Sequence, residues 1–199
     1  MRTAILASGR GSNLQALIEA CQSGYLPIEI VAVGSDQLGT GALQRSEEVG
    51  IPTRVFPINN YPHRQAQEED ILIWIQENRV ELLLLAGYMR VLGPQFISQA
   101  QFPIMNIHPS LLPAFPGLHA QRQALEYGVK VSGCTVHLVD QGLDSGPIIL
   151  QEAVPVLPQD TEESLAQRIL EVEHRLYPEA VRLLALGQVE RSGRRVKIL

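Results

Sequence analysis

Short apolar runs alternate with helix-like segments along the first half of the chain, and no other feature restricts the fold so strongly. Residues 3–7, 28–33 and 82–86 are mostly apolar segments of the length expected for strands. Between them, apolar residues recur every three or four positions, as they do on one face of a helix. Strand–helix–strand units of this kind build a mostly parallel sheet. The unbroken apolar run at 82–86 further predicts a central strand covered on both faces.

The second half of the chain has a different pattern. Residues 131–139 alternate in polarity and are rich in β-branched side chains, and residues 148–156 form another strand-like run. The segment between them, residues 140–147, is dense in the residues that favour turns. We therefore predict one α/β domain: a Rossmann-like, mostly parallel central sheet with helices on both faces and an antiparallel C-terminal portion.

Helix signals dominate the C-terminal region. Asp160 and Glu163 have the spacing of a capping box, and we expect a helix to begin there. Pro178 should kink this helix, because proline removes an amide donor and crowds the preceding turn. Beyond it, residues 189–199 predict a small hairpin around Ser192 and Gly193. Four cations gather in that segment without a role that the sequence explains: Arg191, Arg194, Arg195 and Lys197.

Composition argues against several classes of protein. The 199 residues are 45% hydrophobic, as in ordinary globular chains, and no apolar run approaches the roughly 20 residues that cross a bilayer. The formal net charge of −5 argues against bulk binding of nucleic acid. Cys21 and Cys134 lack metal-ligand spacing, so we expect reduced thiols. The N-terminus lacks the long apolar region of a signal peptide, and we expect a cytoplasmic protein.

An Asn-x-His pair lies at the end of the apolar run at residues 104–107. Asn106 and His108 are two positions apart, so their side chains leave an extended chain on the same side. Strand ends in open α/β sheets are common ligand sites. The amide can donate to a developing oxyanion, and the imidazole can carry a proton near neutral pH. We therefore predict a catalytic pair, with a polar strand end that caps a turn as the plainer alternative.

Asp144 lies in the turn-dense loop at residues 140–147. It is either a solvated turn residue, as acids in exposed loops usually are, or a carboxylate that folds back onto His108. In the second case it would favour the protonated imidazole. The five histidines show no metal-ligand spacing, and no G-x-S-x-G nucleophile elbow occurs. We therefore expect neither a metal nor a serine nucleophile.

A glycine-rich loop follows the first predicted strand. Gly9 and Gly11 precede a helix, where backbone N–H groups and the helix dipole favour an anion. Leu14 occupies the position where a dinucleotide fingerprint has a small residue, and the loop has no P-loop lysine. Gly11, Ser12 and Asn13 therefore suit a single terminal phosphate, and a simple glycine turn with an N-cap is equally consistent.

Three segments, in this order along the chain, resemble one enzyme family. They are Ala7–Leu17, Asn106–Gly117 and Asp140–Ile149. Together they resemble the phosphoribosylglycinamide formyltransferases, which are folate-dependent formyltransferases, and the likeness runs from Thr3 to about Gly187. It implies transfer of the formyl group of 10-formyltetrahydrofolate to the amine of glycinamide ribonucleotide, in de novo purine (IMP) biosynthesis. The folate carries the one-carbon unit, so the likeness implies no metal.

The resemblance also implies which residues act. The catalytic trio would be Asn106, His108 and Asp144. The ribonucleotide would be bound by Gly11, Ser12, Asn13 and Glu173. The folate would be bound by Arg64, Met89, Arg90, Val91, Leu92 and Asn106. Without the resemblance, Glu173 would be taken as an exposed helix acid and Arg64 as a solvated cation.

The expected organisation is a single formyltransferase domain over residues 1–199. Residues 1–100 would form the nucleotide- and phosphate-binding half, and residues 101–199 the folate-binding and catalytic half. The partners would be the two small-molecule substrates, with no nucleic acid and no membrane, in a monomer or homodimer. The alternatives are a formyltetrahydrofolate hydrolase with the same trio and a non-catalytic nucleotide-binding module that uses only the glycine loop.

Overall fold

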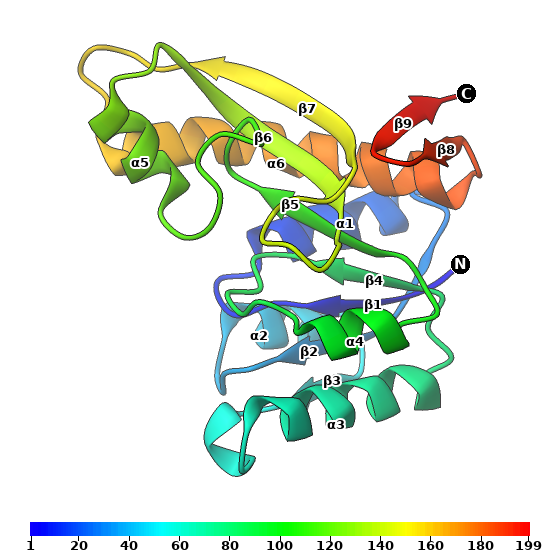
Figure 1. Ribbon diagram of the computed structural model, residues 1–199. Coiled ribbons are helices and arrows are strands. Elements are labelled where there is room, and N and C mark those ends of the chain that lie inside the picture. The colour runs from blue at the N-terminus through cyan, green and yellow to red at the C-terminus, as the bar shows by residue number, and fades with distance from the viewer. The chain divides into compact units, whose positions relative to one another are not determined.

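Seven of the strands form one sheet, ordered β3-β2-β1-β4-β5-β6-β7, in the computed structural model of residues 1–199 (Figure 1). A separate two-stranded sheet pairs β8 with β9. The chain divides into two compact units, Met1–Met105 and Asn106–Leu199, and β5 (Ile104–His108) crosses the division. The α/β class, the mostly parallel sheet and the antiparallel C-terminal portion are confirmed.

The first unit contains four parallel strands with helices on both faces. The strands are β1 (Arg2–Leu6), β2 (Glu29–Ser35), β3 (Thr53–Val55) and β4 (Leu82–Leu85). In the register, Ile5 lies opposite Val33 on one side and Leu84 on the other, and all three are fully buried. This burial confirms that the apolar runs belong to strands covered on both faces.

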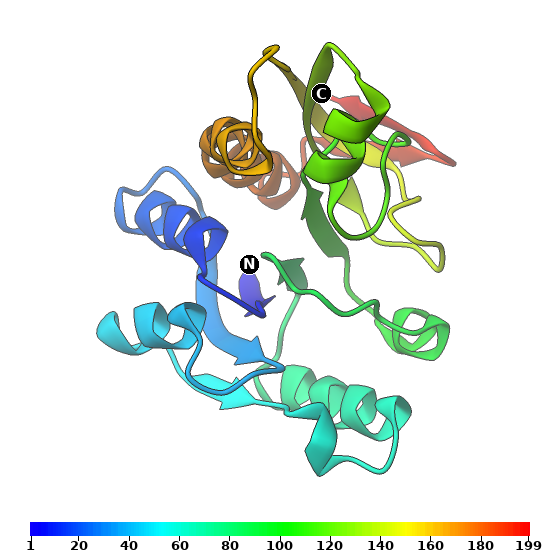
Figure 2. The ribbon, with the colours of Figure 1, turned by 90° about the vertical axis from the view of Figure 1, so that its left-hand side faces the viewer.

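Helices of the first unit form two pairs. They are α1 (Ser12–Gln22), α2 (Gly41–Glu48), α3 (Arg64–Glu77) and α4 (Pro94–Gln99), with a short 3-10 turn at Ile58–Asn60. The first two contact each other, as do the last two, and Figure 2 shows the pairs on opposite faces of the strands. Because these strands are parallel, the loops that follow β1, β2 and β4 all leave the same edge of the sheet, at the carboxyl ends of the strands. Ligands bind at this edge in such sheets.

The second unit is built around an antiparallel pair. Strands β6 (Val131–Leu138) and β7 (Ile148–Pro155) place Cys134 opposite Glu152. Helix α6 (Glu162–Ala185) packs on both strands, and α5 (Ala120–Tyr127) contacts α6. The predicted C-terminal hairpin is confirmed as β8 (Val189–Ser192) and β9 (Arg195–Ile198). None of the helices combines the length and the apolar character that a bilayer crossing requires.

The start of α6 differs by one residue from the prediction. Thr161 is the N-cap, its side chain accepts from Ser164 N, and Ser164 Oγ accepts in return from Thr161 N. The predicted Asp160–Glu163 box is therefore wrong. Asp160 instead forms an ion pair with Arg168 at 2.7 Å. Both Asp and Thr are good N-caps, so sequence alone did not separate two adjacent candidates.

Pro178 lies inside α6, which is a single helix from Glu162 to Ala185. Its neighbours Tyr177, Ala180 and Val181 are fully buried. Packing of this apolar stripe offsets the amide hydrogen bond that proline cannot make.

Candidate active site

Asn106 and His108 emerge from the end of β5 in the second unit. Met105 and Ile107, which face the opposite way, are buried and anchor the strand. His108 is only 5% exposed, so its ring has few routes to bulk water. The following loop contains a cis Leu112–Pro113 bond, and Phe115 has a φ of 52°.

Both ring nitrogens of His108 face hydrogen-bond acceptors. Nε2 lies 2.8 Å from the carbonyl oxygen of Phe115, and Nδ1 lies 3.4 Å from Oδ2 of Asp144. A carbonyl and a carboxylate accept hydrogen bonds but do not donate them, so a ring nitrogen that faces either one must bear the proton of any hydrogen bond between them. The loop after β5 and the loop at residues 140–147 therefore each place an oxygen beside the imidazole of His108.

Asp144 is held in place from its own loop and from the loop after β5. Its φ of 47° is left-handed, a conformation that Asp tolerates better than most residues. Gly117 N donates to Asp144 Oδ2 at 2.7 Å. Within the loop, Asp140 Oδ1 accepts from Gly142 N at 3.1 Å and from Ser145 Oγ at 2.6 Å. These bonds aim the carboxylate at His108.

His137 joins the three expected residues, and sequence reasoning missed it. It lies on β6 and is 2% exposed. Its Nε2 lies 3.2 Å from Nδ2 of Asn106 and 3.8 Å from Oδ1 of Asp144, while Nδ1 lies 2.9 Å from the carbonyl oxygen of Leu138. Burial lowers the pKa of His137 below its usual range. Thr135 and His137, polar residues at alternating positions of a buried strand, were the available signal.

Thr135 supports the loop after β5 from the same strand. Its hydroxyl donates to the carbonyl oxygen of Ser110 at 2.7 Å and accepts from Leu112 N at 3.0 Å. Gln151 on β7 adds a bond to the carbonyl oxygen of Leu112 at 2.8 Å. The backbone that follows His108 is therefore fixed by side chains from two strands.

Glu173 is on α6 and is 6% exposed, so it is not the exposed helix acid that the plainer interpretation expects. It acts electrostatically on Cys134 of β6, whose pKa is raised to about 12 by burial first and then by Glu173 and Glu152. Cys134 therefore stays a protonated thiol near neutral pH and is no candidate nucleophile.

The glycine loop of the first unit has the backbone geometry of an anion site. Gly11 has a φ of 73° and caps α1, and a Cβ there would lie 2.6 Å from Cα of Ala42. Only glycine meets both requirements. Ser12 begins the helix and Asn13 is buried within its first turn. Backbone N–H groups in a first turn have no partner within the helix, so they are suited to an anion.

The loop after β4 lies against the glycine loop. Ser8 N donates to the carbonyl oxygen of Gly87 at 3.1 Å, and Met89 N donates to Ser8 Oγ at 2.9 Å. Of the four residues expected to bind folate here, Met89 and Val91 expose 61% and 54% of their surface, whereas Leu92 is buried. Arg90 is half-buried. The loop thus offers apolar surface directly beside the expected phosphate loop.

Arg64 is tied to the same loop through Glu68. Arg64 Nε lies 2.7 Å from Oε1 of Glu68, and that oxygen also accepts from Gly93 N at 2.8 Å. The side chain of Glu68 is only 7% exposed. Arg64 itself is exposed at the start of α3, as the plainer interpretation expects, but it is paired with a buried carboxylate. Glu68 is a second residue that sequence reasoning missed.

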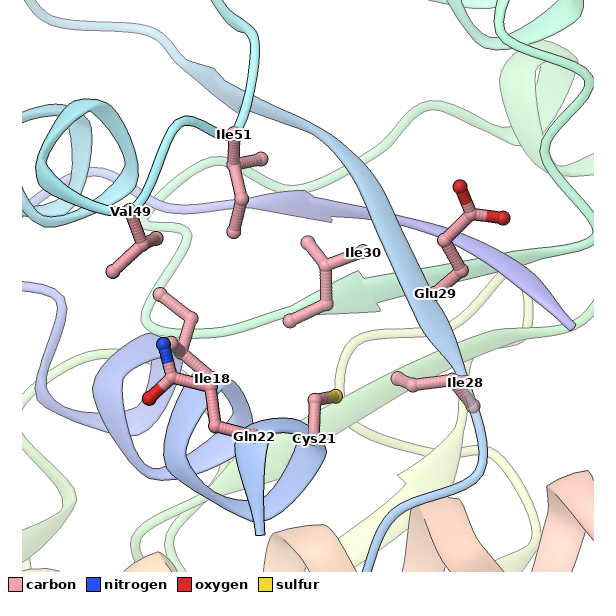
Figure 3. A pocket seen from close by; sticks show the side chains of 8 residues that line it. All are labelled: Ile18, Cys21, Gln22, Ile28, Glu29, Ile30, Val49 and Ile51. Carbon is pink, nitrogen blue, oxygen red and sulfur yellow. The ribbon is translucent and has the colours of Figure 1, made fainter. Parts of the chain in front are cut away.

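A hollow of about 290 Å³ lies elsewhere in the first unit, between the last turns of α1 and the start of β2 (Figure 3). Burial raises the pKa of Cys21 in its wall to about 11, so that thiol stays protonated. The lining is mostly apolar: Ile18, Cys21, Gln22, Ile28, Glu29, Ile30, Val49 and Ile51. The glycine loop lies at the opposite end of α1, and we assign this hollow no part in the chemistry.

The predicted residues therefore fall in both units. Asn106, His108 and Asp144 gather around His137 in the second unit, where Glu173 lies on α6. The glycine loop and the loop after β4 are hydrogen-bonded in the first unit. No group of three or more His, Cys, Asp or Glu side chains is arranged to hold a metal ion.

Comparison with known proteins gives the family. The formyl transferase family model matches residues 1–181. The phosphoribosylglycinamide formyltransferase of Mycobacterium tuberculosis is 43% identical over 203 aligned residues, which cover 99% of this chain and 94% of that protein. The crystal structure of glycinamide ribonucleotide transformylase 1 from Symbiobacterium toebii is 50% identical with a TM-score of 0.97, covering 100% of this chain and 94% of that one.

Longer proteins also match. The trifunctional purine biosynthetic protein adenosine-3 of Drosophila pseudoobscura pseudoobscura is 48% identical over 96% of this chain, which spans only 14% of that protein's length. The resemblance predicted from the three sequence segments is confirmed by these matches. The chain belongs to the formyl transferase family and, within it, to the phosphoribosylglycinamide formyltransferases.

Proposed function

We propose that this protein transfers the formyl group of 10-formyltetrahydrofolate to the amine of glycinamide ribonucleotide. The products are formylglycinamide ribonucleotide and tetrahydrofolate, in the de novo route to purines. The observation that carries the proposal is the contact of His108 with Asp144, beside Asn106, in a chain of this family. An amide donor and an imidazolium at one place are what an acyl-type transfer requires.

In the proposed reaction, the substrate amine attacks the formyl carbon and a C–N bond forms. The carbonyl oxygen becomes an oxyanion, which Asn106 stabilises through Nδ2–H and His108 through its positive charge. His108 gives a proton to the folate nitrogen as the bond from that nitrogen to carbon breaks. The proton lost by the attacking amine then restores the imidazolium, so the protein ends unchanged. Asp144 favours the charged imidazole throughout.

We further propose that the substrates use the remaining expected residues. Gly11, Ser12 and Asn13 bind the phosphate of the ribonucleotide, and Glu173 binds its glycinamide portion. The folate contacts Arg64, the loop at Met89–Leu92 and Asn106. The left-handed Gly11 and the exposed apolar surface of Met89 and Val91 support these roles.

The organisation follows the same proposal. Within one formyltransferase domain, residues 1–100 supply the phosphate loop and the folate contacts Arg64 and Met89–Leu92, and residues 101–199 supply the catalytic trio and Glu173. The protein acts in the cytoplasm on these two small molecules, as a monomer or homodimer, without a resident metal, a nucleic acid or a membrane.

Turnover with both substrates tests the function. The purified protein is mixed with 10-formyltetrahydrofolate with and without glycinamide ribonucleotide, and the absorbance of the released tetrahydrofolate is followed. We expect release that depends on the ribonucleotide. Release without the ribonucleotide would identify a formyltetrahydrofolate hydrolase instead. No release, together with binding of the ribonucleotide, would identify a non-catalytic binding module.

A further inference from the structure

We propose that His137 is a positioning residue that orients the amide of Asn106. Its unprotonated Nε2 accepts one Nδ2–H of Asn106, which leaves the second N–H available for the formyl oxygen. The inference rests on the proposed function, since it assigns Asn106 the donor role there. It deepens that function by naming the group that determines whether the nitrogen or the oxygen of the Asn106 amide faces the formyl group.

The tautomer of His137 follows from its backbone contact. Nδ1 lies 2.9 Å from the carbonyl oxygen of Leu138, which can only accept a hydrogen bond. Nδ1 therefore carries a proton. A neutral imidazole has a single N–H, so Nε2 presents a lone pair.

The lone pair fixes the amide of Asn106. Nε2 lies 3.2 Å from Nδ2 of Asn106, a distance suited to an N–H donor. If the amide turned by 180°, its oxygen would face the Nε2 lone pair, and neither atom could donate. Because His137 is 2% exposed, solvent has little access to replace the lost bond. The turned amide is therefore disfavoured, and an N–H donor is retained for the substrate.

The surroundings of His137 keep it neutral. Burial is the leading influence and opposes the charged form, and the nearby His108 acts in the same direction. The hydrogen bond to Leu138 acts in the opposite direction, as do Asp144, with Oδ1 3.8 Å from Nε2, and Asp140, but they do not prevail over burial. The site thus contains two histidines with different tasks. His108 lies beside a carbonyl oxygen and a carboxylate, whereas His137 forms its hydrogen bonds with one carbonyl acceptor and one amide donor and suits the neutral form.

Two substitutions separate the ring nitrogens. In His137→Asn, the short amide reaches the position of Nδ1 and can still donate to Leu138, but nothing replaces the Nε2 acceptor. In His137→Gln, the longer amide can bring its oxygen to the position of Nε2. We expect His137→Asn to lower kcat about 10- to 100-fold, with a smaller change in the KM of either substrate, because the loss is that of one aligned oxyanion donor. His137→Gln should recover most of this loss.

A double-mutant cycle tests whether the effect passes through Asn106. If His137 acts by orienting that amide, then Asn106→Ala combined with His137→Asn should be no slower than Asn106→Ala alone. Ser132→Ala, a buried change on the same strand, is the control for packing and should leave kcat unchanged. Losses that multiply in the double variant, or a His137→Asn protein with the kcat of the unmodified one, would overturn the proposal.

Nitrogen-15 NMR of the imidazole rings reports the tautomer of His137 directly and needs no activity measurement. We expect His137 to show a protonated Nδ1 and an unprotonated Nε2 at neutral pH, and the opposite tautomer or an imidazolium would refute the proposal. The spectrum also distinguishes failure of the proposed formyl transfer from failure of the proposed contact between His137 and Asn106. A protein with the expected tautomer but no release of tetrahydrofolate would remove the proposed function and leave the contact with Asn106 established.

Discussion

His108 has an oxygen of a different kind beside each of its two ring nitrogens. The Phe115 carbonyl and the Asp144 carboxylate lie 2.8 Å and 3.4 Å from its two ring nitrogens. The carboxylate carries a negative charge and the carbonyl does not, so the two partners make different contributions. The carboxylate stabilises the cation electrostatically, and the carbonyl holds the ring in one orientation. Substitution of Asp144 therefore tests the contribution of the charge while the carbonyl partner stays in place.

Removing the imidazole should abolish most turnover without loss of ribonucleotide binding. We expect His108→Ala to lower kcat by about 10²- to 10⁴-fold, because a positioned proton donor contributes that much. Steady-state kinetics and calorimetric binding of the ribonucleotide provide the two measurements. The control is His63→Asn, which replaces an exposed histidine at the N-cap of α3 by another capping residue. Near-full activity in His108→Ala would contradict the assigned role.

Asp144 offers a pair of substitutions that distinguish its charge from its backbone. Asn tolerates the left-handed φ of 47°, so Asp144→Asn should fold with close to normal stability but with a strongly reduced kcat. Ala removes the charge and also resists this φ, so Asp144→Ala should be less stable by about 1 kcal/mol or more. Denaturant unfolding measures the difference. Equal stability of the two variants would show that the backbone conformation carries no strain.

At the scale of elements, loops are held by single polar anchors from neighbouring segments. Glu68 on α3 holds the loop after β4 at Gly93, and Ser8 holds the same loop at Met89. In the second unit, Arg194 of the C-terminal hairpin donates from Nη2 to the carbonyl oxygen of Ser145 at 2.7 Å. This contact gives one cation of the hairpin a structural partner beside Asp144.

Loss of the Glu68 anchor should weaken folate binding. Glu68→Ala leaves the buried Gly93 N–H without its acceptor and releases Arg64, which should cost about 1–3 kcal/mol locally. We expect the KM for the formyl donor to rise more than the KM for the ribonucleotide. Glu69→Ala, the exposed neighbour, is the matched control. Equal changes in both KM values would point to general destabilisation.

Loss of the Arg194 contact should loosen the loop that carries Asp144. Arg194→Ala removes the donor to Ser145, and we expect faster amide hydrogen exchange in residues 140–147 than in the unmodified protein. Arg195→Ala changes the same charge in the same exposed hairpin and should leave that exchange unaltered. If both variants exchange alike, the contact does not order the loop.

Sequence patterns predicted most elements because strand and helix periodicities are local. They also identified the Asn106–His108 pair, since side chains two positions apart on a strand point to the same side. They missed His137 and Glu68, because those contacts depend on how separate elements pack, which no local pattern encodes. The shifted cap at Thr161 has another cause: two adjacent residues were equally able to cap, and the partner of Asp160, Arg168, lies eight positions along the helix.

At the scale of the whole molecule, His137 and Asp160 are two of the groups that make stability depend on pH in the acid range. The pKa of His137 is lowered from its ordinary value of 6.5, so the folded state binds fewer protons than the unfolded state. Its stabilising contribution is complete above pH 6.5 and is lost as the pH falls. The Arg168 guanidinium holds the pKa of Asp160 below its ordinary value of 3.8, so that contribution is lost only under stronger acid.

Unfolding measured between pH 7 and pH 5 should therefore show a falling free energy. One group exchanging one proton gives a slope of at most about 1.4 kcal/mol per pH unit. His137→Gln removes the titrating group, so its curve should be flatter over this interval, whereas Ser132→Ala should keep the slope of the unmodified protein. A slope that His137→Gln leaves unchanged would assign the acid sensitivity to other groups.

The acceptor that faces Nε2 of His108 is a main-chain atom of residue 115. Every amino acid that a codon can specify supplies the same oxygen at that point. A complete scan of side-chain replacements would thus leave this partner in place unless the replacement altered the course of the peptide. This contact of His108 is therefore insensitive to side-chain substitution at residue 115, and only a change in the course of the loop can remove it.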